Sequence, residues 1–123
     1  MLFSILLAVV ALAIGLTVQT NKSVKEMISI RNCAYVIMTK DGKRGRRFMF
    51  RHGKYSTDKV LTDFDLALVF ENADVGFKTL ALGGDTGLQV AMNNYDLMLV
   101  GNAKIFNFFG VLIAVSMGMM KRK

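Results

Sequence analysis

The chain has 123 residues, enough for one ordinary domain, and roughly 100 of them remain for that domain if the first twenty lie in a bilayer. Hydrophobic residues make up 53% of the chain and its net charge is +7. Because Cys33 is the single cysteine, an intramolecular disulfide and a cysteine-based metal cluster are both excluded.

The first segment carries no charged side chain from Met1 to Val18. At 1.5 Å per residue such a helix nearly crosses a hydrocarbon core of ~30 Å, and Gln19 and Thr20 suit the interface. The pattern predicts a transmembrane anchor over residues 1–20. A cleaved signal peptide is the alternative, but no basic residue precedes the apolar stretch, so an uncleaved anchor is favoured.

The charge that follows this segment sets its predicted orientation. Between Lys22 and Lys59 there are eleven Lys or Arg residues against three acids, and no Lys or Arg precedes the span. The positive-inside bias therefore predicts a single-pass protein whose N-terminus is outside and whose C-terminal domain is cytoplasmic.

Residues 21–31 place Val24, Met27, Ile28 and Ile30 close to helical spacing, which predicts a juxtamembrane helix or linker. The remaining residues, 32–123, are expected to form one domain that ends in an apolar helix.

Period-two alternation begins at Cys33 and predicts a hairpin that turns at Gly42. On its return strand, Phe48, Phe50 and His52 are expected on one face, and Arg47, Met49 and Arg51 on the other. A second turn over residues 52–54 extends the meander to Thr57. Residues 65–70 predict a further, largely buried strand.

Helical spacing returns after Asn72, a plausible N-cap, and ends at Gly83 and Gly84. Asp85 or Thr86 is expected to cap a second short helix that ends at residues 93–94. A strand over 95–100 and an apolar helix over 105–120 follow. At sixteen residues that last helix is short for a second span, so burial against the sheet or at the bilayer interface is favoured.

This order of elements predicts an α+β fold, a small mostly antiparallel sheet with helices packed on one face. From about residue 34 to residue 115, two-thirds of the chain, the sequence resembles the sterol carrier protein-2 domain. The resemblance runs through Ala34-Tyr35-Val36, Gly53-Lys54, Asp65-Leu66-Ala67-Leu68 and, above all, Tyr95-Asp96-Leu97-Met98-Leu99-Val100-Gly101-Asn102-Ala103-Lys104. Members of that family usually begin with an amphipathic helix that covers the sheet.

The resemblance implies a tunnel between sheet and helices that takes a sterol, an acyl chain or another lipid without a covalent step. The side chains that could line such a tunnel are apolar and equally suit an ordinary core. They are Phe48, Phe50, Leu66, Leu68, Phe77, Leu80, Met92, Leu97, Phe106, Phe109 and Leu112.

A basic cluster lies a few residues beyond the expected span, where it would meet anionic headgroups. It consists of Lys43, Arg44, Arg46, Arg47, Arg51 and Lys54. Nucleic-acid binding is disfavoured, because the alternation sends Phe48 and Phe50 away from Arg47 and Arg51. A plain solvated strand is the third interpretation.

No catalytic constellation is recognisable, since His52 stands alone and the glycine-rich stretch 83–87 lacks the ending of a phosphate loop. We therefore expect no enzyme, no cofactor and no metal site. The expected function is a membrane-anchored module that binds membrane lipid, a sterol or an acyl chain. The alternative is an accessory or structural subunit of a membrane complex, or a homo-oligomer, that uses a ligand-free sterol-carrier-like fold; protein partners or self-association are expected, and nucleic acid is not.

Overall fold

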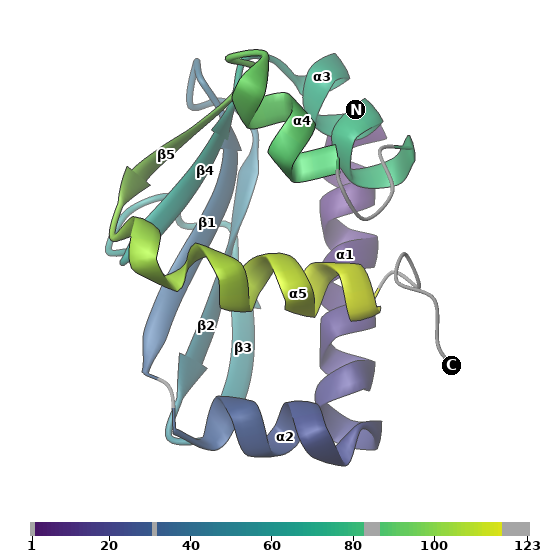
Figure 1. The fold of residues 1–123 in the computed structure, drawn as a ribbon, viewed down its shortest axis with the longest axis vertical. Helices are drawn as coiled ribbons and strands as arrows, with labels where there is room; N and C mark the ends of the chain where they lie inside the picture. The colour runs from purple at the N-terminus through teal and green to yellow at the C-terminus, as the bar shows by residue number, and fades with distance from the viewer. Residues whose placement is uncertain (1, 31, 83–86, 117–123) are drawn as a thin grey trace.

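The computed structural model describes residues 2–30, 32–82 and 87–116, which form a sheet with helices packed on one of its faces (Figure 1). The elements are α1 (Leu2–Thr20), α2 (Lys22–Ser29), β1 (Cys33–Thr39), β2 (Gly45–Arg51), β3 (Lys54–Asp58), β4 (Leu66–Phe70), α3 (Ala73–Phe77), the π-helical η1 (Lys78–Leu82), α4 (Gly87–Asn93), β5 (Leu97–Gly101), the 3-10 turn η3 (Ala103–Ile105) and α5 (Phe106–Ser116). The α+β architecture predicted from the sequence is confirmed.

The sheet has five strands in the order β3-β2-β1-β4-β5. Three of its pairings are antiparallel, and the central pair β1–β4 is parallel. The β1–β2 hairpin turns at Gly42, whose φ of +74° favours glycine. Its register sets Tyr35 opposite Phe48, so two aromatic side chains stand together on the face that the helices cover.

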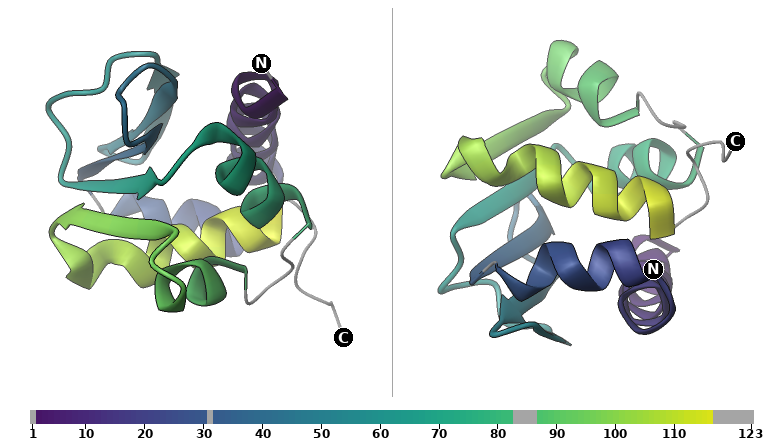
Figure 2. Two further views of the ribbon diagram at one scale, coloured as in Figure 1. Left: turned by 90° about the horizontal axis from the view of Figure 1, so that it is seen from above. Right: turned by 60° about the horizontal axis from the view of Figure 1, so that its bottom comes forward.

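The helices divide that face between them (Figure 2). The long helix α1 packs on β2 and β3, α3 lies against β4, and α4 lies against β5. Helix α5 runs from the end of the sheet toward α1 and packs against it, which closes the layer. One continuous hydrophobic core results, between the sheet and all of these helices.

Helix α1 contributes one face to that core. Its buried residues recur every three or four positions, the spacing of a helix face. They are Phe3, Leu6, Leu7, Val10, Ala11, Ile14 and Val18. The helix expected from residues 1–20 is present, and it lies where the family resemblance expects a covering helix. It packs within the same core as the residues of the 32–123 segment.

Several boundaries differ from the sequence-based expectation. Asn72 does cap α3, since its side chain accepts a hydrogen bond from the N–H of Val75, but the helix changes to π-helical form at Lys78. His52 lies beyond β2 in a left-handed turn (φ +54°) and is exposed, so its expected place on the apolar strand face is wrong. The expected caps at residues 83–86 and the end of the last helix beyond residue 116 lie outside the described residues.

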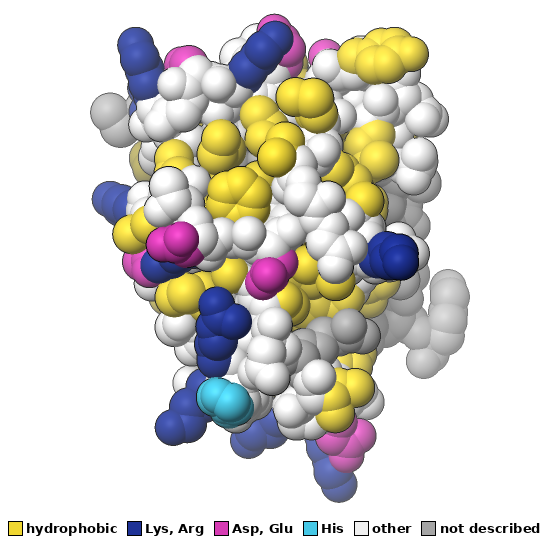
Figure 3. All heavy atoms as spheres, turned by 90° about the vertical axis from the view of Figure 1, so that its left-hand side faces the viewer, with side chains coloured by type: hydrophobic (Ala, Val, Ile, Leu, Met, Phe, Trp, Pro, Cys, Tyr) yellow, Lys and Arg dark blue, Asp and Glu magenta, His cyan; other side chains and the backbone are white. Residues whose placement is uncertain are grey.

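The opposite face of the sheet carries a second, smaller apolar cluster (Figure 3). Val36, Ala67 and Val69 are buried there beneath Leu61 and Phe64, which belong to the β3–β4 connection. Toward β5 this cover ends, and Met98 and Val100 are 55% and 42% exposed. Figure 3 shows apolar side chains on this face with charged ones around them.

The Gly101–Asn102 pair turns the chain from β5 into α5. Gly101 has a φ of +112°, and a Cβ at this position would clash with the carbonyl of Asp65. Asn102 then donates its N–H to that same carbonyl at 2.8 Å, and its side chain accepts the N–H of Lys104. The glycine and the asparagine are therefore both required by the local geometry.

Candidate functional site

The interior between sheet and helices gathers all eleven residues that the sequence predicts around a lipid cavity. Their side chains belong to one hydrophobic cluster. Eight are buried: Phe48, Phe50, Leu66, Leu68, Leu80, Leu97, Phe109 and Leu112. The other three are partly buried and pack against them: Phe77, Met92 and Phe106. The structure thus brings the set together on the helix-covered side of the sheet.

Aromatic rings form the middle of this interior. The rings of Tyr35 and Phe109 stack with centroids 4.2 Å apart and planes 13° from parallel. Phe48 contacts Phe109 at 5.4 Å, and Phe50 meets Phe108 edge to face at 5.6 Å. Such arrangements suit the quadrupoles of the rings, and they make the interior an aromatic, apolar environment.

Tyr35 is the central residue that sequence reasoning left out of the predicted lining. Its hydroxyl donates to the carbonyl of Ile105 at 2.9 Å, which ties the start of α5 to the centre of the sheet. The period-two pattern places Tyr35 on the same face as Ile37, so the signal was present. Phe3 was left out as well, because residues 1–20 were assigned to a membrane anchor; its ring packs edge to face on Phe70.

The outward face of α1 is apolar too. Leu2, Ile5, Val9, Leu12 and Leu16 are 47–70% exposed and follow one another at intervals of three and four residues. We call these five residues the outer stripe. Among the described residues, α1 is the one helix whose length and composition would allow it to cross a membrane; 39% of its apolar window is buried in the domain. A helix in the core of a soluble protein meets the same criterion.

The six predicted basic residues separate into three groups. Arg47 is bound in a bidentate ion pair, in which its guanidinium donates to both carboxylate oxygens of Asp58 at 3.1 and 2.7 Å. This pair lowers the pKa of Asp58. Arg51 and Lys54 face each other at the far turn of the β2–β3 hairpin. Lys43, Arg44 and Arg46 lie at the opposite end of β2, near α1.

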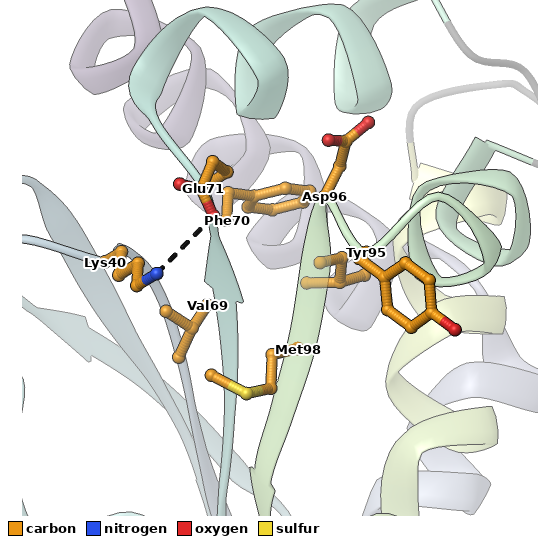
Figure 4. Close-up of a pocket in the computed structure, with 8 residues that line it drawn as sticks. Lys40, Val69, Phe70, Glu71, Tyr95, Asp96 and Met98 are labelled. Carbon is orange, nitrogen blue, oxygen red and sulfur yellow. Dashed lines mark ion pairs between the residues drawn. The ribbon is translucent and has the colours of Figure 1, made fainter.

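A shallow hollow of about 190 Å³ lies on the uncovered face of the sheet, at the junction of β4 and β5 (Figure 4). Val69 and Met98 form its apolar wall, and Lys40 and Glu71 form an exposed ion pair of 3.8 Å at its edge. Tyr95, 90% exposed and with a φ of +62°, borders it. Its volume is below the ~300 Å³ typical of small-molecule sites.

Tyr55 connects β3 to α1 at the edge of the interior. Its hydroxyl donates to the carbonyl of Ala11 at 2.9 Å, and burial raises its pKa well above the ordinary value of 10.0. The hydroxyl is therefore a permanent hydrogen-bond donor at neutral pH. Within residues 2–30, 32–82 and 87–116, no group of three His, Cys, Asp or Glu side chains is placed to hold a metal ion.

No protein-family model matches the sequence, and no curated protein matches it. Solved structures do resemble it in fold. The solution structure of the sterol carrier protein domain 2 of Helicoverpa armigera has a TM-score of 0.61 at 10% identity, over 93% of this chain and 89% of that one. A crystal structure of sterol carrier protein 2 has a TM-score of 0.59 at 11% identity, over 90% and 95%. The UbiJ-SCP2 ubiquinone synthesis protein has a TM-score of 0.58 at 14% identity, over 79% and 78%. The chain therefore has a sterol-carrier-protein-2-like fold.

Proposed function

We propose that this protein is a membrane-associated, non-enzymatic module that binds a sterol or an acyl chain between its sheet and its helices. The observation that carries the proposal is the aromatic interior around Tyr35 and Phe109, closed by the apolar helices α1 and α5. The solved structures of like fold include proteins named as sterol carriers, which supports the same ligand class.

The direct test is to identify any lipid that copurifies with the protein. The full chain is purified without added lipid, extracted with organic solvent and examined by mass spectrometry, and it is then titrated with dehydroergosterol and with cis-parinaric acid. A stoichiometric lipid, or saturable binding of either probe, supports the proposal. An empty protein that binds neither probe would refute it.

The outer stripe of α1 is the part of the molecule proposed to contact the bilayer. Five exposed apolar side chains on one helix face bury most favourably in the boundary between headgroups and acyl chains. The packing of Phe3, Leu7 and Ile14 in the core favours a helix that lies in the plane of the membrane, because a spanning helix would remove these side chains from the domain. We place the domain on the cytoplasmic side, because the anionic lipids of the cytoplasmic leaflet attract basic segments such as residues 22–59.

Sidedness distinguishes this arrangement from the single-pass one. In a Cys33→Ala background, Ser4→Cys and Lys59→Cys are each labelled in intact cells with a membrane-impermeant maleimide. Protection of both positions until the cells are opened supports the in-plane arrangement. Labelling of position 4 from outside, with position 59 protected, would establish the single-pass protein predicted from the sequence instead.

A second candidate function is that of an accessory or structural subunit, or a homo-oligomer, which uses the same fold without a ligand. The regular three-and-four spacing of the outer stripe favours it, because that spacing also suits packing against another helix. Sizing of the native protein in mild detergent tests this candidate, since a monomer over a wide concentration range would exclude self-association.

A further inference from the structure

A groove runs between α1 and the edge strand β3, on the outside of the core just described. Its volume is about 460 Å³, within the range of ~300–1,000 Å³ common for ligand sites. Ala8, Ala11 and Gly15 of α1 form one wall, where small side chains leave room beside the helix. Leu12 and Leu16, 70% and 63% exposed, form its outer rim.

The floor of this α1–β3 groove is fixed by hydrogen bonds. Tyr55 lies across it with its hydroxyl on the carbonyl of Ala11. The Thr57 hydroxyl donates to the carbonyl of Arg47 at 2.8 Å and accepts from the Arg46 guanidinium at 3.4 Å. The groove therefore exists before any ligand binds, which reduces the entropic cost of binding.

A second hollow of about 410 Å³ continues the groove toward the start of α1, and Ala8 and Arg46 line both. Three further cations, Lys43, Arg44 and Lys59, line this end. None of the described residues that line the two hollows is Asp or Glu.

The alternation of β2 explains why Arg46 reaches this place. Arg46 lies two residues before Phe48 and therefore points to the same, α1-facing side of the sheet, whereas Arg47 points to the opposite side and pairs with Asp58. Two acids lie near this end. Asp58 is paired with Arg47 and also interacts electrostatically with Arg46. The Asp41 carboxylate accepts from the Thr39 hydroxyl at 2.6 Å and from the N–H of Lys43 at 2.9 Å. With Arg47 included, five cations face these two acids, so this end of the groove stays positively charged.

We propose that the α1–β3 groove binds one acidic phospholipid, with its phosphate among Lys43, Arg44, Arg46 and Lys59 and one acyl chain along Gly15 and Tyr55. The apolar rim and the cationic end match the two parts of such a molecule, and Arg and Lys bind phosphate through charge-assisted hydrogen bonds. The site is separate from the aromatic interior. It rests on the proposed function only in that an in-plane α1 would set the open groove beside the bilayer, from which the lipid enters.

The experiment titrates the isotopically labelled full chain, by NMR, with three soluble probes below their micelle concentrations. These are palmitoyl lysophosphatidate, palmitoyl lysophosphatidylcholine and inorganic phosphate. We expect lysophosphatidate to shift the amide signals of Gly15, Arg46 and Tyr55 and to bind at least about tenfold more tightly than lysophosphatidylcholine, the factor that a lost charge-assisted hydrogen bond commonly produces. Inorganic phosphate, which has no chain, is expected to bind at least as weakly as lysophosphatidylcholine.

Two variants and a matched control locate the site. Lys43→Gln with Arg46→Gln should remove the preference for lysophosphatidate. Gly15→Leu should weaken the binding of both lysolipids, because the leucine side chain fills the apolar end of the groove. Lys22→Gln with Lys25→Gln removes the same charge from exposed positions on α2 and should leave the preference unchanged. Equal affinities for the two lysolipids, or an equal loss in the control, would overturn the proposal. So would phosphate binding as tightly as lysophosphatidate.

The two proposals fail separately. Shifts confined to Phe109, Leu112 and their neighbours would place the lipid in the interior, which supports the proposed function and overturns the groove site. Shifts at the groove in a protein that binds no sterol or acyl chain inside would support the groove and overturn the interior site.

Discussion

The ring of Phe3 packs directly on Gly76, so closely that a Cβ added to Gly76 would lie 2.5 Å from Cε1 of that ring. This contact joins the first turns of α1 to α3. It requires a residue without a side chain at position 76, and it exists only while α1 is docked on the domain.

The first prediction follows from that contact. Gly76→Ala should lower the free energy of unfolding by about 1–3 kcal/mol, the usual cost of overpacking a core. Gly110→Ala is the control, because its Cβ would meet Leu88 at an ordinary 3.7 Å and alanine favours the helix. Chemical denaturation measures both. Equal stability of the two variants would mean that α1 is not docked in solution.

The second prediction concerns the aromatic interior. Phe109→Ala removes a ring that stacks on Tyr35 and contacts Phe48, and it should cost about 3–5 kcal/mol of unfolding free energy. Val111→Ala, two residues along and 43% exposed, should change stability by no more than about 0.5 kcal/mol. Thermal unfolding, monitored by circular dichroism, compares the stabilities of the two variants. A small effect of Phe109→Ala would show that the rings do not form the core.

The third prediction is a pH dependence. The Arg47 guanidinium lowers the pKa of Asp58 below its ordinary 3.8, so the stabilisation is present above that ordinary value and is lost as the pH falls through the lowered pKa. Asp58→Asn should therefore be less stable than the natural chain at pH 7, and the difference should shrink below about pH 4. Denaturation curves at several pH values measure this.

The control for that experiment is Glu71→Gln, which breaks the long, exposed pair with Lys40. Exposed ion pairs contribute little, so its stability should follow that of the natural chain at every pH. If the stability difference between Asp58→Asn and the natural chain stayed constant down to pH 2, the ionised carboxylate of Asp58 would not be its source.

The fourth prediction tests the turn between β5 and α5. Gly101→Ala combines a φ of +112° with a clash against the Asp65 carbonyl, whereas Gly42→Ala keeps a φ of +74° but meets nothing within 4 Å. The second change should cost about 1 kcal/mol for its conformation alone, and the first clearly more. If denaturation shows equal losses, the chain relieves the clash by moving locally.

Much of the sheet could be predicted because its signals are local. The alternation after Cys33, the turn at Gly42 and the cap at Asn72 all act within a few residues, and each appears in the structure. No local sequence pattern indicates that β1 pairs in parallel with β4. This pairing depends on where the intervening residues 40–65 place β4 relative to β1.

The environment of α1 was harder to predict. An uncharged apolar helix has the same sequence pattern whether lipid or protein surrounds it. Only the positions of the other elements show that Phe3 and Ile14 face the core while Leu12 is exposed. Arg46 was grouped with Arg47 by sequence proximity, although the alternation places the two side chains on opposite faces. The α1–β3 groove joins residues far apart in the chain and could not be found without the fold.

The docking of α1 against α3 and α5 also affects the order of events during synthesis. A ribosome makes α1 before the elements that pack against it, so the core-facing side of α1 is not fully covered until α5 has emerged. During that interval the nascent chain is exposed to aggregation, or to capture by a chaperone or a membrane. The shorter the time between the synthesis of α1 and that of α5, the shorter this exposure of the apolar core face of α1.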